Sequence, residues 1–295
     1  MANDKISLNA LIEEAEAAKL SLNAYLLPRS AAELEITEEE LLAQMAQMLK
    51  VMEEAAAYGL TGVRSHSGLT GGSALKLQNA AAQPGFNKLL GALATDAVTY
   101  ALAVSECNAA MGRIVAAPTA GAAGVLPGVL LALKKHCNLT EEQLARALVV
   151  AGQIGLVIAA RASLAGAVGG CQAECGSAAA MAAGAAVDAL GGTPAQAGTA
   201  VSIVFKNMLG LVCDPVAGLV EVPCIKRNGG AAVQALLAAE MALAGIGSFI
   251  PADEAIDAMK WVGDSMPCAL RETAGGGLAQ TPTALAWAKA WFERE

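Results

Sequence analysis

The chain is poor in histidine and in aromatic side chains. Among its 295 residues there are two His, three Trp, three Tyr and four Phe. Two histidines cannot by themselves complete a His-built zinc site, and the zinc-protease motif H-E-x-x-H does not occur. Ala and Gly supply much of the apolar content. Such small side chains let backbones approach closely, so we expect tightly packed helices.

Several motifs of nucleotide and ester chemistry are also missing. The sequence has no Walker-type G-x-x-x-x-G-K and no G-x-S-x-G nucleophile elbow. The segment GIGSFI at 245–250 lacks the third Gly of a dinucleotide fingerprint. Strand-like alternation is weak throughout. These absences argue against P-loop, α/β-hydrolase and dinucleotide-binding folds.

Positive charge is scarce as well. The net charge is −8, and residues 1–60 hold eleven acids and four bases. An acidic chain without a basic stripe is not expected to bind nucleic acid or an anionic membrane surface. The polar start lacks the apolar segment of a secretion signal, so we expect a cytoplasmic protein.

One uncharged run, 114–133, is long enough to cross a bilayer. It contains Pro118, Pro127 and three glycines, which would leave backbone groups unsatisfied in lipid. We therefore interpret it as a loop followed by a buried helix.

The apolar spacing predicts an all-α fold: a single compact multi-helix domain over 1–295, with Gly-rich functional loops between the helices. Thr37 with Glu40 and Thr140 with Gln143 form capping boxes, and Ser7 and Thr193 are further N-caps, the latter followed by Pro194. Pro28 is expected to break the helical pattern. The expected helices cover 8–20, 38–60, 86–112, 141–166, 167–192, 195–211, 229–245 and 252–262.

Seven cysteines, at 107, 137, 171, 175, 213, 224 and 268, are the first candidates for chemistry. An odd number without an export signal favours metal or catalytic roles over disulfides. Cys171 follows a Gly pair in AVGGCQAEC, and Cys213 and Cys224 bound CDPVAGLVEVPC. Thiolates suit iron–sulfur clusters and zinc. Spacing alone leaves buried, inert thiols as an equal alternative.

Two Gly-rich segments are the next candidates. In GVRSHSGLTGGSALK, at 62–76, hydroxyls alternate with glycines before a helix start. Backbone N–H groups in such a loop can bind an anion, and an amino-acid carboxylate would fit. The alternative is an ordinary capped helix entry. The segment APTAGAAGVLPG, at 117–128, has one hydroxyl, Thr119, and by itself indicates only a tight turn.

Taken together, SHSGLTGG, APTAGAAGVLPG, GGCQAECG and CDPVAGLVEVPC resemble the α chain of iron–sulfur-dependent L-serine dehydratase (L-serine ammonia-lyase), and the resemblance extends over essentially the whole chain. It implies a 4Fe–4S cluster held by Cys171, Cys213 and Cys224, with one iron left open. Cys175 is the main rival ligand. The remaining cysteines are then structural or incidental.

The resemblance also implies the activity of the chain. L-Serine would lose water at the open iron, which acts as a Lewis acid, and the product would hydrolyse to pyruvate and ammonia. This is a lyase reaction of amino-acid catabolism that can feed gluconeogenesis. A separate β subunit is implied, within a hetero- or homo-oligomer. The catalytic base is left open between His66, Lys76, a hydroxyl of the 65–70 loop and the partner chain. The substrate-binding candidates are Ser65, Ser67, Gly68, Thr70, Gly71 and Thr119.

Three other functions are compatible with some of these features. L-Cysteine desulfidation on a related cluster would expel sulfide instead of water. A pyridoxal-phosphate enzyme would need a Schiff-base lysine and usually a fold containing a sheet. A non-catalytic helical assembly subunit would use the acidic N-terminal helices for docking and would bind no metal.

Overall fold

The computed structural model describes residues 6–293, and over that range the chain folds into helices. Extended backbone pairs there only at two isolated bridges, Arg64 with Gly71 and Cys213 with Arg271. The all-α prediction is confirmed. The α-helices are α1 (Leu8–Ala17), α2 (Leu22–Glu33), α3 (Glu38–Gly59), α4 (Ser73–Ala82), α5 (Gly91–Ala109), α6 (Val125–Cys137), α7 (Glu141–Arg161), α8 (Gly166–Gly169), α9 (Ser177–Ala189), α10 (Pro194–Met208), α11 (Cys224–Leu243), α12 (Ala252–Ser265) and α13 (Pro282–Phe292).

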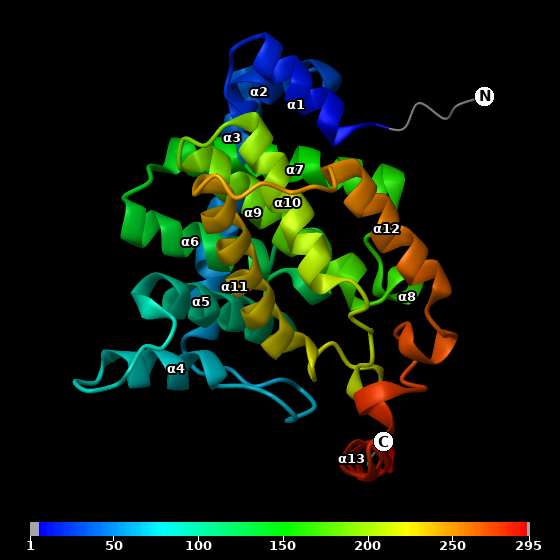
Figure 1. Cartoon of the computed structure of the whole chain (residues 1–295). Helices are drawn as coiled ribbons and strands as arrows, with labels where there is room; N and C mark the ends of the chain where they lie inside the picture. The colour runs from blue at the N-terminus through cyan, green and yellow to red at the C-terminus, as the bar shows by residue number, and fades with distance from the viewer. Residues whose placement is uncertain (1–5, 294–295) are drawn as a thin grey trace.

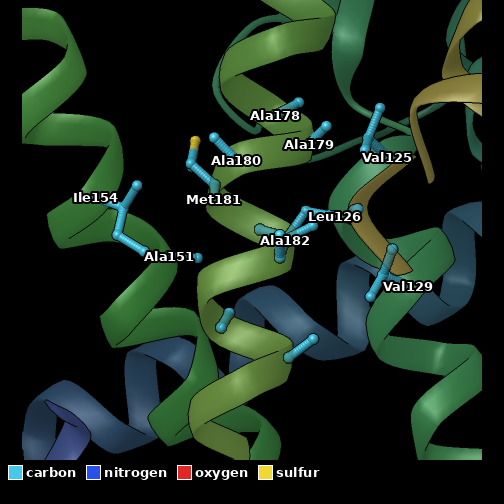
Figure 2. Packing of buried hydrophobic residues seen from close by; sticks show 14 of the residues in the cluster. Val125, Leu126, Val129, Ala151, Ile154, Ala178, Ala179, Ala180, Met181 and Ala182 are labelled. Atoms are coloured by element: carbon cyan, nitrogen blue, oxygen red, sulfur yellow. The ribbon is translucent and has the colours of Figure 1, made fainter. Parts of the chain in front are cut away.

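Helix α9 lies at the centre of the hydrophobic core. From Ser177 to Asp188 each of its residues is buried, and most of them are Ala. Figure 2 shows α9 between α7, which contributes Ala151 and Ile154, and α6, which contributes Val125 and Val129. A helix that is apolar on all sides is stable only when neighbours surround it, and α10 and α11 also pack against α9.

Glycines bring α6 and α5 into close contact. A Cβ atom on Gly128 would lie 2.7 Å from the Ala97 carbonyl oxygen and 2.8 Å from the Ala101 Cβ atom. A Cβ atom on Gly124, just before α6, would likewise overlap the carbonyl oxygen of Ala101. Two helices can approach this closely only where the side chain between them is absent.

The predicted helix starts are largely confirmed. Thr37, Thr140 and Thr193 each accept a hydrogen bond from the backbone three residues on, and the Glu or Gln at that position bonds back. Ser7 accepts from the Ala10 amide. Each cap is worth about 0.5–2 kcal/mol, because it satisfies amides that the first turn leaves without a helical partner.

Other boundaries differ from the predictions. Pro28 lies inside α2 and does not end it. This prediction was wrong because Pro28 is on the exposed side of the helix, where water can solvate the carbonyl that its ring frees. Helix α11 begins at Cys224, five residues before the predicted start. Helices α2, α4 and α13 lie outside the predicted helices, and the buried set of α13 consists of Ala284.

The uncharged run 114–133 forms a loop and then the buried helix α6, as predicted. A different helix, α7, is long and apolar enough to cross a membrane by composition. In the fold, 67% of its most apolar window is buried inside the protein. Its apolar surface is therefore accounted for by core packing.

The first and the last helices lie at opposite ends of the molecule. Figure 1 shows α1 and α2 at one end and α4 and α13 at the other. The long segment between α10 and α11, in yellow, descends toward α13. The loop before α4 extends into the same region. The segments that carry the candidate residues therefore gather at the end opposite α1.

We expect Gly128→Ala to destabilise the protein by about 1–3 kcal/mol, because the added methyl group would force α6 away from α5. Gly152→Ala is the matched control. Gly152 is an exposed residue inside α7, and no atom lies within 4 Å of the position that a Cβ atom would take, so the change should stabilise by roughly 0.5–1 kcal/mol. Urea unfolding of both variants measures the difference. Equal stability of the two would contradict the close α5–α6 contact.

Candidate functional site

The structure brings three distant cysteines into one buried region. Cys171 lies between α8 and the π-helical turn Gln172–Gly176, Cys213 lies in the α10–α11 segment, and Cys224 begins α11. Their exposed fractions are 3%, 3% and 7%. Burial raises the pKa of both other thiols and negative charge on Cys171 raises it further, so the three lie within electrostatic reach of one another.

Cys171 is the thiol that the surroundings favour as a thiolate. A hydrogen bond from Cys175 lowers the pKa of Cys171, and the positive charge of Arg227 lowers it further. The Arg227 guanidinium also lies 2.9 Å from Asp214 and donates to the Val212 carbonyl oxygen at 2.7 Å. Gly170 makes the turn before Cys171 possible with a φ of 76°.

Cys213 and Cys224 are in the opposite electrostatic situation. Burial, followed by the negative charges of Cys171 and Glu174, raises the pKa of Cys213 and brings that of Cys224 to about 12. Thiols in this setting become thiolates when a positively charged centre offsets their charge. The donor set therefore suits a cationic guest bound by sulfur.

Glu174 is a carboxylate placed among these cysteines. A Cβ atom on Gly166 would lie 2.9 Å from a Glu174 oxygen and 2.9 Å from the Cys213 sulfur. Burial and then the charge of Glu272 raise the pKa of Glu174, while the neighbouring Thr119 hydroxyl lowers it. Thr119, predicted to bind substrate, thus lies at the edge of the cysteine region.

A segment near the C-terminus holds Cys213 from the other side. The Cys213 amide donates to the Leu270 carbonyl oxygen at 2.9 Å, and the Glu272 amide donates to the Cys213 carbonyl oxygen at 2.7 Å. The Leu278 amide donates to Asp214 at 2.8 Å. These bonds fix the backbone on both sides of the Cys213 side chain.

Asn228 joins two of the predicted loops. It is fully buried, accepts from the Gly124 amide at 2.9 Å, and donates to the carbonyl oxygens of Gly121 and Cys224 at 2.7 and 2.9 Å. One side chain therefore holds the Gly/Pro segment 117–128 against the first turn of α11.

The Ser/Thr loop 65–70 is held by Glu221, which precedes Cys224 by three residues. Ser67 and Thr70 donate to the two Glu221 carboxylate oxygens at 2.8 and 2.6 Å. Glu221 is 7% exposed. Val220, the residue before Glu221, and Glu174 both pack against Gly121. Because Glu174 lies among the cysteines, the loop that Glu221 holds borders the cysteine region.

The backbone donors of this loop bind groups of the chain itself. The amides of Ser73 and Ala74 donate to the buried Glu106 carboxylate at 2.7 and 3.2 Å. The Leu69 and Thr70 amides donate to the hydroxyls of Ser67 and Ser65. The helix start predicted to receive a substrate anion is therefore occupied by Glu106.

The two candidate bases lie at the periphery. His66 is exposed and packs edge-on against Trp291 of α13, with ring centres 6.0 Å apart. Lys76 is exposed in the first turn of α4. Over residues 6–293, neither side chain has a hydrogen bond or ion pair with the three cysteines.

The remaining cysteines differ in their surroundings. Cys175 is fully enclosed, and its hydrogen bond with Cys171 and its burial raise its pKa well above the usual value. Cys107 is buried, and Cys137 and Cys268 are exposed.

In the described range, no three His, Cys, Asp or Glu side chains are arranged to hold one metal ion. A cluster differs from a single ion in that each thiolate binds its own iron, so its ligands are spaced more widely.

The residues that sequence reasoning missed are mostly partners in long-range contacts. Glu221, Asn228 and Arg227 each bond to groups far away in the chain or on another loop. Each lies within four residues of Cys224, which is the one signal that could have drawn attention to them.

A family model described as serine dehydratase alpha chain matches residues 4–279. Two curated relatives match most of their own length. A probable L-serine dehydratase alpha chain of Bacillus subtilis (strain 168) is 58% identical over 86% of this chain and 85% of the relative. An L-serine dehydratase alpha chain of Peptoniphilus asaccharolyticus is 44% identical over 84% of each.

A longer relative matches in part. An L-serine dehydratase of Escherichia coli (strain K12) is 47% identical over 61% of this chain, but only 40% of the relative is covered. The remainder of that protein lies outside the match to this chain.

We expect Asn228→Ala to destabilise the protein by about 2–4 kcal/mol, because it leaves the buried Gly124 amide and the Gly121 carbonyl oxygen without their partner. Asn207→Ala is the control, since Asn207 makes one exposed bond to Gln234 and its loss should cost about 0.5 kcal/mol or less. Thermal or urea unfolding tests both. Similar losses would show that Asn228 does not hold the two segments together.

Proposed function

We propose that this chain, which belongs to the serine dehydratase alpha chain family, is the catalytic, cluster-carrying subunit of an enzyme that converts L-serine to pyruvate and ammonia. The observation that carries the proposal is the convergence of Cys171, Cys213 and Cys224 in one buried region of a chain from this family. The names of the relatives favour serine dehydration over cysteine desulfidation and over a non-catalytic assembly role.

Cys171, Cys213 and Cys224 would hold a 4Fe–4S cluster. Three points support the fit: the donors are soft sulfur atoms, the positive charge of Arg227 lies beside Cys171, and Gly166 lets the backbone approach Cys213 closely. When bound, such a cluster with three thiolate ligands supplies an open iron that acts as a Lewis acid toward the substrate hydroxyl.

The residues of the chain would then orient the substrate and limit access of water. The 65–70 loop and Thr119 border the cysteine region and provide the substrate contacts, from Ser65, Ser67, Gly68, Thr70 and Gly71. The bonds from the 270–278 segment cover Cys213. Glu174 lies among the thiols and adds negative charge there.

Loss of the serine hydroxyl requires a base for the α-proton. His66 and Lys76 are the candidate bases of this chain; His66 lies within the Ser/Thr loop, and Lys76 lies in the first turn of α4, which follows it. Their exposure leaves room for the partner chain to complete the site. Proton removal and departure of the hydroxyl give an aminoacrylate, which tautomerises to an imine that water hydrolyses to pyruvate and ammonia.

The alpha-chain naming of the relatives implies a separate beta subunit. The longer Escherichia coli relative, of which only 40% is matched, supports the same division of the enzyme. We infer that this chain works with a beta subunit in an oligomer, in the cytoplasm, and that its pyruvate enters central metabolism, gluconeogenesis included.

The proposal is tested by replacing single cysteines and preparing the protein without oxygen. Cys171→Ser, Cys213→Ser and Cys224→Ser should each lower iron and sulfide content after reconstitution. Serine turnover, measured with the complete enzyme, should fall by more than the roughly 10- to 100-fold that loss of an outer-shell partner costs. Iron, sulfide and pyruvate assays provide the measurements.

Two further variants serve as controls. Cys137→Ser changes an exposed thiol and should leave both iron content and turnover as in the wild type. Cys175→Ser tests the rival ligand and should retain iron and sulfide. Full cluster content in Cys213→Ser, or loss of the cluster in Cys175→Ser with retention in Cys171→Ser, would overturn the ligand assignment.

A further inference from the structure

The carboxylate of Glu221 determines which way the hydroxyls of the 65–70 loop point their protons. Ser67 Oγ donates to Glu221 Oε1 at 2.8 Å, and Thr70 Oγ1 donates to Glu221 Oε2 at 2.6 Å. A hydroxyl carries one proton and two acceptor lone pairs. Because a carboxylate can only accept, both hydroxyl protons are committed to Glu221, and the two hydroxyls can offer a ligand only acceptor positions.

The Thr70 hydroxyl can accept more further hydrogen bonds than the Ser67 hydroxyl can. Ser67 Oγ already accepts from the Leu69 amide at 3.0 Å and lies 3.2 Å from Ser65 Oγ. The Thr70 hydroxyl oxygen accepts no hydrogen bond from residues 6–293, so its lone pairs remain open. Both residues are partly exposed, which leaves them accessible to a small molecule.

Several backbone donors at this place are already engaged by groups of the chain. The amides of Gly68, Leu69 and Thr70 bond within the loop, and the first amides of α4 bond to Glu106, whereas those of His66, Ser67 and Gly71 donate to no group of residues 6–293. A carboxylate ligand needs donors, whereas an ammonium group needs acceptors. The hydroxyls of Ser67 and Thr70 therefore match a donor cation better than an anion.

The charge balance favours the same kind of ligand. Glu221 is 7% exposed, and over residues 6–293 it forms no ion pair with Lys, Arg or His. The neutral hydroxyls supply no countercharge to the Glu221 carboxylate, so a cation beside them is favoured electrostatically. A substrate ammonium is compact and has three donors, so it can contact both hydroxyls.

We propose that Glu221, acting through Ser67 and Thr70, forms the site for the α-ammonium group of the substrate and so selects 2-amino acids over the corresponding 2-hydroxy acids. This rests on the proposed function and deepens it. Glu221 is a positioning residue, because the two hydroxyls, and not its own oxygens, contact the ligand. Ser67 and Thr70 are the residues that bind the amino group.

The test compares two unreactive ligands that differ only at this group, L-alanine with an ammonium and L-lactate with a hydroxyl. In the reconstituted complete enzyme, Glu221→Gln should weaken L-alanine binding by on the order of 10- to 100-fold and leave L-lactate binding nearly unchanged, because only the ammonium group loses the attraction of the Glu221 charge. Inhibition constants against L-serine and calorimetric titration give the two affinities. The KM of L-serine should rise more than kcat falls.

Asp188→Asn is the matched control. Asp188 is a buried carboxylate bonded to Asn23, far along the chain from the loop, so its replacement should leave the ratio of alanine to lactate affinity unchanged. Iron and sulfide content in both variants shows whether the site is intact. A Glu221→Gln enzyme that binds both ligands as the wild type does, or loses both equally, overturns the inference.

A second pair of variants decides the matter if Glu221→Gln does not fold. Thr70→Val removes the acceptor and should lower the alanine-to-lactate affinity ratio, whereas Thr70→Ser keeps the hydroxyl and should preserve it. An unchanged ratio in Thr70→Val contradicts the ammonium site. Failure of the proposed function is distinguishable, because a wild-type enzyme that does not release pyruvate from L-serine shows it before any variant is compared.

Discussion

The site depends on how closely the helix backbones approach one another. Gly128 and Gly124 let α6 contact α5, and the Ala-rich α9 lets four neighbours surround it. Cys171 lies just before α9 and Cys224 begins α11, so the spacing of these two helices sets the distance between the two thiols. Larger side chains in the core would separate the helices and move the cysteines apart. The abundance of Ala and Gly is thus a condition for the site as well as for the fold.

Buried negative charge is the second feature of this region. Glu106 occupies the start of α4, Glu221 holds the Ser/Thr loop, and Glu174 lies among the thiols. Arg227, which contacts Cys171 and Asp214, is the cation that the contacts identify there. Burying several acids with so little countercharge is unfavourable unless positive guests bind. An iron–sulfur centre and a substrate ammonium would both supply positive charge where these groups lie.

Local sequence signals predicted the helices well and the site incompletely. The capping boxes at Thr37, Thr140 and Thr193 depend on residues three apart, so they can be read directly from the chain. The effect of Pro28 could not be read in this way, because a proline is tolerated inside α2 only on the side of the helix that faces water. The cysteine and hydroxyl segments were found by their composition. Their connections through Glu221 and Asn228 span more than a hundred residues, and no local pattern encodes a bond of that range.

The orientation of the loop hydroxyls has a consequence for how a small amino acid would be held. Serine offers an ammonium, a carboxylate and a hydroxyl, and acceptors on Ser67 and Thr70 suit the first of these. The guanidinium of Arg227 is already engaged by Val212, Asp214 and Cys171, so it is not free to clamp the carboxylate. In the proposed function the carboxylate and hydroxyl are therefore left for the metal. Each substrate group then has its own partner, and the carbon that loses its proton is fixed between the two ends.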